Sequence, residues 1–401
     1  MVKILTIGQL PKEVGGNYTT GVARVVHELS KQSVDGVQQF LYATNIADEK
    51  AKKLCNYPMQ YIGYRKLYWK ILSNIFFHPI RTIKQWSHYK KVCHVNPLRM
   101  EFHRVNMEEA IKAIKPDIIH NHSSFVSSCF FAAKSYGIPI IRTYHGLVCK
   151  GDGDPRYLKV ADEAIGTIFF AKHYTALTTE NASEVERLGI DRSIITIIPN
   201  GIDSTKYYFS IEERLHMRKE LGVKDNEFVF MTVGRLIDRK GQLSFLKILQ
   251  SSGIDYHYWL FGDGPDYEEI KSFVTANRLD KRVILFGQVN GEVLYKYYSA
   301  ADFYSHASTT EGQSLAEIEA FSSGLRIVVN SMIAGTVIGN AHNDHDNYYI
   351  MDFANTDMDS FIPWLTRKVP ERKSRPYYDW SIIASLYGEL YYKIMRQNGG
   401  K

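Results

Sequence analysis

The sequence has few cysteines and no long apolar run. The spacing of its four cysteines fits neither a metal site nor a redox pair, which favours a reducing compartment and buried thiols: Cys55, Cys93, Cys129 and Cys149. The apolar run within Met1–Leu10 is too short for a signal peptide and is typical of a first strand. No run approaches the length of a membrane span. We therefore expect a cytoplasmic protein.

The motifs of several enzyme classes are also missing. The sequence contains no G-x-S-x-G, no P-loop lysine and no kinase motif set, so serine hydrolase and ATPase chemistry lack support. No H-E-x-x-H motif or Cys/His pairing indicates a metal site. Asp152 and Asp154, and likewise Asp344 and Asp346, have D-x-D spacing. Such triplets are common in loops, and we predict no metal.

Acidic residues are absent from one long stretch of the chain. The net charge is +6 overall, yet residues 50–100 contain 11 Lys and Arg and no Asp or Glu. Aromatic residues such as Tyr68, Trp69 and Trp86 are interleaved with these cations. Cations attract anionic lipid head groups, and Trp and Tyr settle at the membrane interface. We predict that residues 50–100 bind an anionic membrane surface, on the inner face of the cell membrane. Inward packing is the main alternative, and nucleic acid a weaker one.

The length of 401 residues exceeds one ordinary core and favours two domains. Short apolar runs alternate with amphipathic stretches, which predicts parallel sheets with helices on both faces. The pattern restarts near residue 200. We predict an α/β protein with two doubly wound, Rossmann-like domains that face a central cleft. They comprise residues 1–200, with an insertion at 50–105, and 201–379, while a helix at 380–401 packs back on the first domain.

The predicted strands are 2–7, 38–44, 117–120, 139–144, 176–179, 194–199, 228–233, 257–261, 283–286, 302–305 and 326–330. The predicted helices are 21–31, 107–114, 125–136, 164–173, 242–250, 267–277, 292–299 and 380–395, with one more that begins at about Leu315.

Two glutamates flank the start of that last-named helix. Glu311 lies in the preceding loop and Glu319 within the helix, while Ser314 and Glu317 have the spacing of a capping box. Gly324 is the expected helix stop. A helix N-terminus presents unpaired N–H groups and suits an anionic ligand such as a diphosphate. The two carboxylates are placed to hold the hydroxyls of a sugar and a ribose.

Cations and glycines follow other strands. Arg235 and Lys240 lie in one loop after a predicted strand, where two cations match a diphosphate leaving group. The turn at 262–265 resembles a phosphate loop without its full fingerprint, and we interpret it as a tight strand-to-helix turn. The turn Gly15-Gly16-Asn17 is either a phosphate contact through backbone N–H groups or a plain turn.

Three histidines end strands of the first half. His120 and His122 end one predicted strand, and His145 ends the next. Side chains at the carboxyl ends of parallel strands face the ligand side of such a domain. A histidine there can donate a hydrogen bond to a sugar hydroxyl or to a developing charge.

Taken in order, the motifs resemble family 4 of the retaining glycosyltransferases with the GT-B fold. The matching segments are GGNYTTGVARVVHELS, DIIHNHS, TYHG, LTTENASEVERLGI, IIPNGID, VGRLIDRKGQ, LFGDGPDYEEIKSF, LDKRVILFGQV, LYKYYSAADFYSHAS and EGQSLAEIEAFSSG. They span roughly residues 1–330, without the 50–105 region.

The resemblance implies a role for each matching residue. Gly16 would contact the donor phosphate through its N–H, and His145 the donor sugar. Arg235 and Lys240 would stabilise the diphosphate as it leaves. Glu311 would hold the sugar hydroxyls. The remaining donor contacts would come from Gln288 and Val289 to the base, Glu319 to the ribose, and the segment Gly312, Gln313, Ser314 and Leu315.

The resemblance also implies the reaction. A sugar would pass from a nucleotide diphosphate sugar, with a UDP-sugar expected, to a glycan or lipid-linked acceptor in bacterial surface polysaccharide synthesis. No cofactor or metal is implied, and retention by front-face attack needs no protein nucleophile. Gln313-Ser314 stands where the family has an aromatic residue and a glycine, which leaves the donor sugar open. The alternatives are a sugar-nucleotide epimerase or phosphorylase on the same fold, and a nucleotide-sugar-binding protein with weakened catalysis. Nothing in the sequence indicates an oligomeric state.

Overall fold

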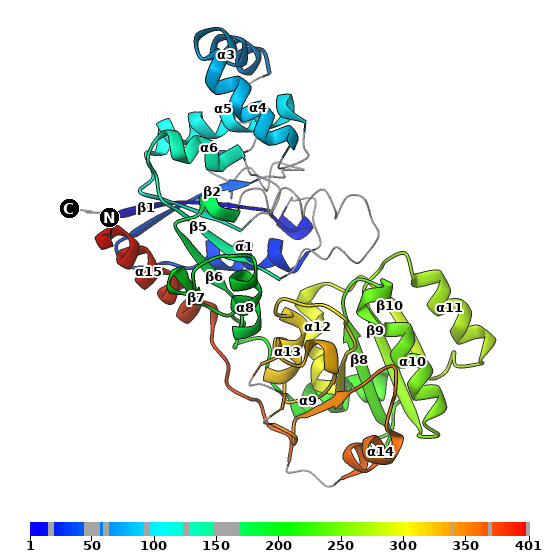
Figure 1. Cartoon of the computed structure of the whole chain (residues 1–401). Helices are drawn as coiled ribbons and strands as arrows, with labels where there is room; N and C mark the ends of the chain where they lie inside the picture. Colours follow the sequence, from blue (N-terminus) through cyan, green and yellow to red (C-terminus); the bar gives the residue numbers. More distant parts are fainter. Residues whose placement is uncertain are drawn as a thin grey trace. The chain divides into compact units, whose positions relative to one another are not determined.

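The computed structural model of the protein describes residues 1–14, 20–43, 57–58, 64–91, 96–122, 128–146, 168–338, 341–342, 344–367 and 371–397. The chain divides into two compact units (Figure 1). Unit 1 comprises Met1–Asn200 and Trp380–Lys401, and unit 2 comprises Gly201–Asp379.

Unit 1 is built on a parallel sheet of seven strands in the order β3-β2-β1-β4-β5-β6-β7. The strands are β1 (Val2–Gly8), β2 (Val37–Ala43), β3 (Tyr57–Pro58), β4 (Ile118–Asn121), β5 (Ile140–Tyr144), β6 (His173–Ala176) and β7 (Ile195–Ile197). The chain runs outward in both directions from the junction of β1 and β4, which is therefore the topological switch point of this sheet.

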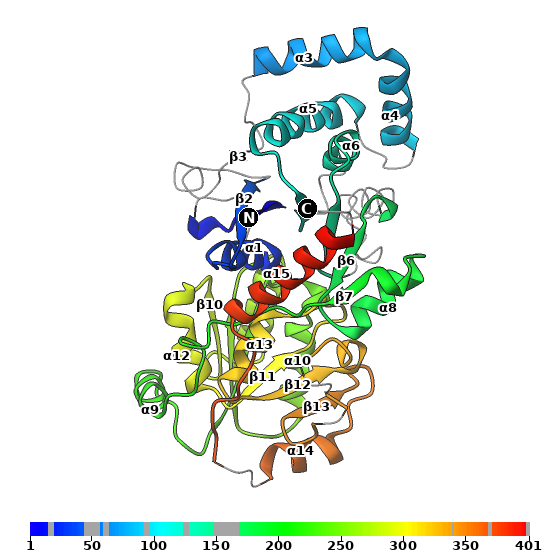
Figure 2. The ribbon, with the colours of Figure 1, turned by 90° about the vertical axis from the view of Figure 1, so that its left-hand side faces the viewer.

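Helices cover both faces of this sheet (Figures 1 and 2). The helices of unit 1 are α1 (Gly21–Ser30), α3 (Tyr64–Phe77), α4 (Pro79–Lys91), α5 (Pro97–Ile114), α6 (Ser128–Ser135), α8 (Thr179–Arg187) and α15 (Trp380–Gln397), with short 3-10 helices η1 (Lys12–Val14), η2 (Ile168–Phe170) and η3 (Arg192–Ile194). Of these, α3 and α4 pack on α5. Side chains alternate across the strands. Leu5 and Ile119 consequently face α5 and α6, whereas Thr6 and His120 face α1 and α15.

Unit 2 is built on a parallel sheet of six strands in the order β10-β9-β8-β11-β12-β13. They are β8 (Phe228–Val233), β9 (Tyr256–Phe261), β10 (Val283–Gly287), β11 (Phe303–His306), β12 (Arg326–Asn330) and β13 (Tyr348–Met351). The helices are α9 (Ile211–Glu220), α10 (Gln242–Ser251), α11 (Tyr267–Ala276), α12 (Gly291–Ala300), α13 (Leu315–Ser322) and α14 (Met358–Thr366), with η4 (Asp238–Lys240) and η5 (Ser331–Ile333). Neighbouring residues of one strand enter opposite cores, as Phe230 and Met231 do. The switch point lies between β8 and β11.

The predicted α/β class with two doubly wound sheets is confirmed. The interpretation of residues 164–179 is wrong where the structure describes it. The strand is His173–Ala176 instead of 176–179, and α8 begins at Thr179, because the Thr178 side chain accepts a hydrogen bond from Asn181 N and caps the helix. Residues 164–167 of the predicted helix lie outside the described residues.

Several elements were not predicted. Helix α5 begins at Pro97 instead of residue 107, and α3, α4, α8, α9, β13 and α14 have no counterpart among the predicted elements. Helix α9 is mostly polar and buries few side chains, Met217 and Arg218 among them, so its periodicity is weak. No helix among the described residues is long and apolar enough to cross a membrane.

Candidate active site

A charged cluster lies at the switch point of unit 2. Arg235 and Lys240 belong to the loop between β8 and α10, and Glu311 belongs to the loop between β11 and α13. Because β8 and β11 are neighbours, their carboxyl ends bring the two loops together. Thr309 N donates a hydrogen bond of 2.9 Å to Arg239 O and ties one loop to the other.

Glycine permits this close approach of the loops. Gly241 has a φ of +67° and ends the 3-10 helix that carries Lys240. A Cβ at this position would lie 2.5 Å from Ala307 O, so a larger residue would push the β11 loop away. At the next turn, a Cβ on Gly264 would lie 2.1 Å from Leu236 O. The turn at 262–265 therefore supports the β8 loop by packing, as the interpretation of a tight turn requires.

Glu311 is held as a carboxylate by its neighbours. It forms an ion pair with Lys240, and Ser308 Oγ donates a hydrogen bond of 2.9 Å to its Oε1. His306 Nε2 lies 3.7 Å from the same oxygen. Burial would raise the pKa of the Glu311 carboxyl, but the Lys240 ammonium and the neighbouring His306 ring outweigh it and hold this pKa well below its usual range. An ionised carboxylate only accepts hydrogen bonds, which suits the hydroxyl groups of a sugar.

The capping box at the start of α13 forms only in part. Ser314 Oγ accepts a hydrogen bond of 3.4 Å from Glu317 N, as predicted. The Glu317 carboxyl is instead fully buried and accepts a hydrogen bond of 2.6 Å from Tyr348 OH. Burial raises the pKa of Glu317 to about 8, because no cation neutralises it there as Lys240 neutralises Glu311. This carboxyl is protonated at neutral pH.

Glu319, predicted to hold a ribose, is only 2% exposed. Tyr298 OH donates a hydrogen bond of 2.8 Å to its Oε2 and orients the carboxyl. Gln313 Nε2 donates a hydrogen bond of 3.3 Å to Tyr377 OH. Gly312 is buried, while Ser314 and Leu315 are partly buried. The predicted residues of the β11 loop and of α13 are thus buried or partly buried.

The other predicted donor contacts of unit 2 vary in position. Arg235 is exposed, and its carbonyl accepts a hydrogen bond of 3.0 Å from Gln242 Nε2. Gln288 and Val289 follow β10 at the edge of the sheet, two strands away from β8. In unit 1, Gly16 and its neighbours Gly15 and Asn17 lie outside the described residues.

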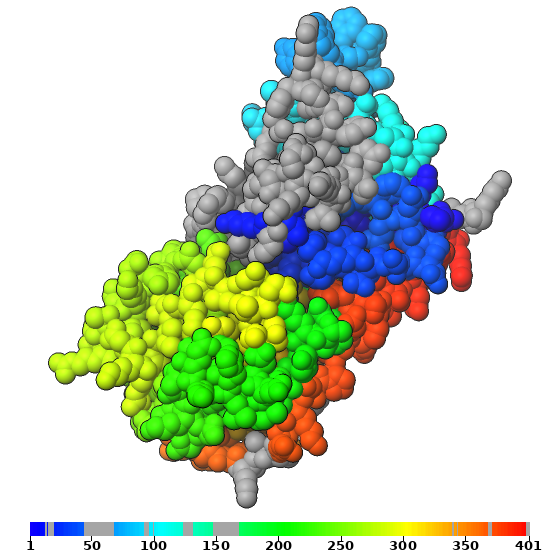
Figure 3. Space-filling view, turned by 180° about the vertical axis from the view of Figure 1, so that it is seen from behind, coloured from blue at the N-terminus to red at the C-terminus, as the bar shows by residue number. Residues whose placement is uncertain are grey.

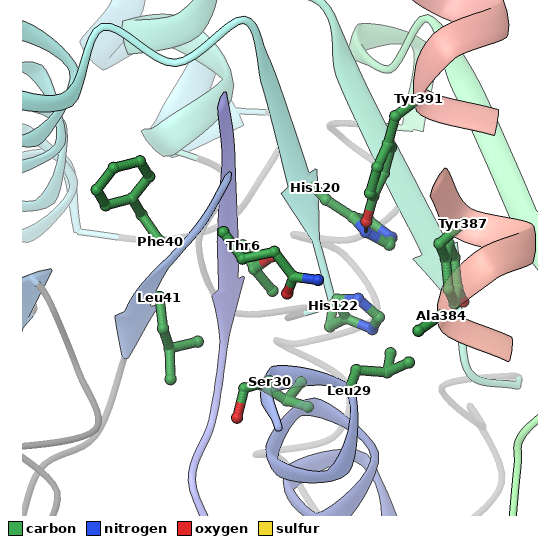
Figure 4. A pocket seen from close by; sticks show the side chains of 12 residues that line it. Thr6, Leu29, Ser30, Phe40, Leu41, His120, His122, Ala384, Tyr387 and Tyr391 are labelled. Carbon is green, nitrogen blue, oxygen red and sulfur yellow. Dashed lines mark hydrogen bonds between the residues drawn. The ribbon is translucent and has the colours of Figure 1, made fainter. Parts of the chain in front are cut away.

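A neutral polar cluster lies in unit 1, between the sheet and α15 (Figure 4). His120 Nδ1 is 2.7 Å from Tyr391 OH, and its Nε2 is 2.7 Å from Thr143 Oγ1. His122 Nδ1 is 3.1 Å from His145 Nε2. His120, His122 and Tyr391 also line a pocket of about 100 Å³, to which α1 and β2 contribute further lining residues.

Burial keeps these histidines uncharged. It lowers the pKa of His120 to about 3 and that of His145 to about 4, and the pKa of His122 is also well below its usual value. A hydrogen bond between two neutral imidazoles needs one N–H and one acceptor nitrogen. The protonation of His122 Nδ1 and that of His145 Nε2 are therefore linked, since one of these nitrogens donates and the other accepts.

Some residues of both clusters carried no signal in the sequence. Tyr298, Tyr348 and Tyr391 are far along the chain from the groups that they bind. His306 is the last residue of β11 and Ser308 lies two residues beyond it, so the strand-end rule applied to His145 also identifies them. Within the described residues, no group of three His, Cys, Asp or Glu side chains is placed to hold a metal ion. Asp152 and Asp154 lie outside those residues.

The chain is similar to known proteins in sequence. Residues 19–206 match the family model Glycosyltransferase Family 4, and residues 213–357 match Glycosyl transferases group 1. The chain is 30% identical over 280 residues, 67% of this chain and 70% of the relative, to the UDP-Gal:alpha-D-GlcNAc-diphosphoundecaprenol alpha-1,3-galactosyltransferase of Escherichia coli. It is 31% identical over 141 residues, 33% of this chain and 35% of the relative, to the alpha-monoglucosyldiacylglycerol synthase of Acholeplasma laidlawii.

A solved structure supports the same assignment of the fold. The crystal structure of Anabaena Alr3699/HepE in complex with UDP superposes with a TM-score of 0.68 at 16% identity, over 98% of this chain and 100% of that chain. The chain belongs to the family 4 glycosyltransferases of the GT-B fold.

Proposed function

We propose that this glycosyltransferase transfers a sugar from a UDP-sugar to a glycan or lipid-linked acceptor in the synthesis of a bacterial surface polysaccharide. The names of the relatives support the substrates. The Escherichia coli enzyme uses UDP-Gal and a diphosphoundecaprenol-linked sugar, and the Acholeplasma laidlawii enzyme makes a glucosyl diacylglycerol lipid. The similar Anabaena fold binds UDP.

The observation that carries the proposal is the Lys240–Glu311 pair at the switch point of unit 2. Open α/β sheets bind ligands at this point. The Lys240 ammonium has three N–H donors, and its ion pair with Glu311 does not use all of them. Lys240 can therefore also bind a phosphate oxygen. Arg235, exposed in the same loop, supplies a second cation for the diphosphate. Glu311, fixed as a carboxylate, accepts hydrogen bonds from the donor sugar.

The reaction proceeds with retention in this proposal. The bond between the anomeric carbon and the UDP oxygen breaks, and the acceptor oxygen attacks from the same face of the sugar. The acceptor proton passes to the departing phosphate. Lys240 and Arg235 stabilise the charge that grows on the leaving group. Because these two positive charges can stabilise the leaving diphosphate, we propose that turnover needs no metal ion.

The remaining donor contacts keep their predicted roles. Glu319, oriented by Tyr298, binds the ribose, and the backbone at Gln288 and Val289 meets the uracil. Gly16 contacts the phosphate and His145 the sugar.

Thermal stability in the presence of EDTA tests the base. UDP at about 100 times its dissociation constant should stabilise the protein by about 2.7 kcal/mol, whereas GDP, ADP and CMP should not. A panel of UDP-sugars with a lipid-linked acceptor extract then tests turnover, and NMR of the product gives the anomeric configuration. Stabilisation by GDP alone would contradict the proposed uracil base. A product with inverted anomeric configuration would contradict the retaining mechanism, and loss of turnover in EDTA would contradict metal independence.

A further inference from the structure

Helices α3 and α4 pack on α5 and form an outer layer of unit 1, drawn in light blue at the top of Figure 3. Several large apolar side chains of these two helices are exposed to solvent. We name these side chains the apolar ridge: Trp69, Leu72, Phe76, Phe77, Ile80 and Ile83. Except for Leu72, which is 37% exposed, they are 64–78% exposed. Contiguous exposed apolar residues of this kind mark interaction surfaces in soluble domains.

The ridge is not needed to hold the helices on the fold. Helix α3 packs on α5 through its opposite face, where Ile71 and Ile75 contact Val105. Trp69, Leu72 and Phe76 follow each other at helical spacing on the outer face. Helix α3 is therefore apolar on two faces, and the fold buries only one of them.

Cations border the ridge. Lys84 and Lys90 of α4 are exposed, and they lie on the same face as Ile80 and Ile83, since residues four and seven apart share a helix face. The only cation of α3 whose ion pair is described, Lys70, turns inward to Glu109 of α5. No acidic residue occurs anywhere in residues 50–100. Lys and Arg are thus the only charged residues of helices α3 and α4 apart from histidines.

We infer that the apolar ridge docks this protein on the surface of an anionic lipid bilayer. Trp69, Phe76 and Phe77 enter the interface between head groups and acyl chains, and the α4 lysines meet lipid phosphates. A second copy of the chain fits less well, because a two-fold contact through the ridge would place lysines against lysines. Nucleic acid would leave the leucine and isoleucines of the ridge without a partner. The inference rests on the proposed function in one respect, since a lipid-linked acceptor lies at such a surface.

Vesicle sedimentation tests the inference. The full chain should bind vesicles of equal parts phosphatidylcholine and phosphatidylglycerol, and bind them more weakly as salt rises, because the Debye length falls from about 10 Å at 0.1 M to about 3 Å at 1 M. The double substitution Phe76→Ser, Phe77→Ser should weaken binding about tenfold or more, since it removes the deepest apolar contacts. Lys84→Gln with Lys90→Gln should remove much of the salt dependence. The matched control, Ile211→Ser with Leu215→Ser on the exposed face of α9, should bind as the natural protein does.

Two readouts separate this inference from the proposed function. The serine variant should keep its thermal midpoint and its stabilisation by UDP, because the ridge belongs to unit 1 and the Lys240–Glu311 pair to unit 2. Equal vesicle binding by the natural protein and this variant would overturn the inference and leave the function standing. A salt-independent preference for neutral vesicles, RNA binding in place of vesicle binding, or a dimer that the serine variant dissociates would also overturn it. Failure of UDP to stabilise either protein would count against the function alone.

Discussion

The Lys240–Glu311 cluster of unit 2 and the histidine cluster of unit 1 lie at similar positions in their sheets, but the first is charged and the second is neutral. In unit 2, Glu311 remains a carboxylate because the neighbouring Lys240 ammonium outweighs the effect of burial on its pKa. In unit 1, burial lowers the pKa of His120 and His145, and the cluster stays neutral. A strand end alone therefore does not set the chemistry of a site. The neighbours of each side chain decide whether it binds a charged group or a hydroxyl.

Glu317 shows that the difference does not follow the boundary between the units. It lies on the helix after Glu311, yet it is paired with Tyr348 instead of a cation. Its raised pKa makes it resemble the histidines of unit 1. Whether a buried group in this protein is charged or neutral thus depends on a neighbouring counter-charge, and substitution of Lys240, Glu317, His145 or His122 tests this dependence.

Removal of the Lys240 ammonium should cause the largest loss of activity. Lys240→Ala should lower kcat about 10²- to 10³-fold, because the variant loses a donor aimed at charge that develops on the leaving group. Steady-state release of UDP measures it. Lys247→Ala, at an exposed position of α10, serves as the control and should turn over normally. Equal rates for the two variants would show that Lys240 does not stabilise the leaving group.

Glu317→Gln should change how stability depends on pH. The folded pKa of about 8 lies above the unfolded value of 4.5, so the folded state keeps a proton that the unfolded state releases. Stability from this group is therefore complete below about pH 4.5 and is lost as pH rises towards 8, with a slope that approaches about 1.4 kcal/mol per pH unit. Glutamine stays neutral and can still accept the Tyr348 hydrogen bond.

The variant should consequently gain thermal stability over the natural protein, and the gain should increase from pH 5 to pH 8. Thermal midpoints across this range measure it. Glu268→Gln, at an exposed site on α11, should show no such trend. A constant difference between Glu317→Gln and the natural protein would show that Glu317 is ionised when folded.

His145→Ala should lower kcat/KM about tenfold, since a neutral hydrogen bond contributes only about 0.5–1.5 kcal/mol. With a pKa of about 4, His145 should add no ionisation to the rate profile between about pH 6 and 8. The difference between the natural protein and the variant should thus be constant over this range. His216→Ala, on the exposed face of α9, is the control. A new inflection near neutral pH that the variant lacks would mean that His145 titrates during turnover.

The smallest loss of activity is expected from substitution of His122, which contacts His145. His122→Ala should lower kcat/KM about threefold by releasing His145 from its fixed orientation. If His122 acts only through His145, the double variant His122→Ala, His145→Ala should be no slower than His145→Ala alone. Kinetics of the four proteins in this cycle measure the coupling. Additive losses would show that His122 acts independently of His145.

Local patterns predicted much of the fold. Apolar runs and their alternation identified most strands of both sheets, because each strand is recognisable from a few adjacent residues. The Ser314 cap and the shared loop of Arg235 and Lys240 were predictable for the same reason. Polar elements such as α9 escaped, because their burial depends on distant partners.

The sequence by itself determined the α/β class, the two-sheet pattern and the positions of the motif residues along the chain, since these follow from interactions over a few residues. Only the tertiary structure decided which strands are neighbours, and therefore that Lys240 meets Glu311 and that His120 meets Tyr391 of the last helix. It also decided that Glu317 is neutral and that the aromatic residues of α3 face outward. Burial and counter-charge arise from contacts between segments that are far apart in the chain, and no local pattern contains them.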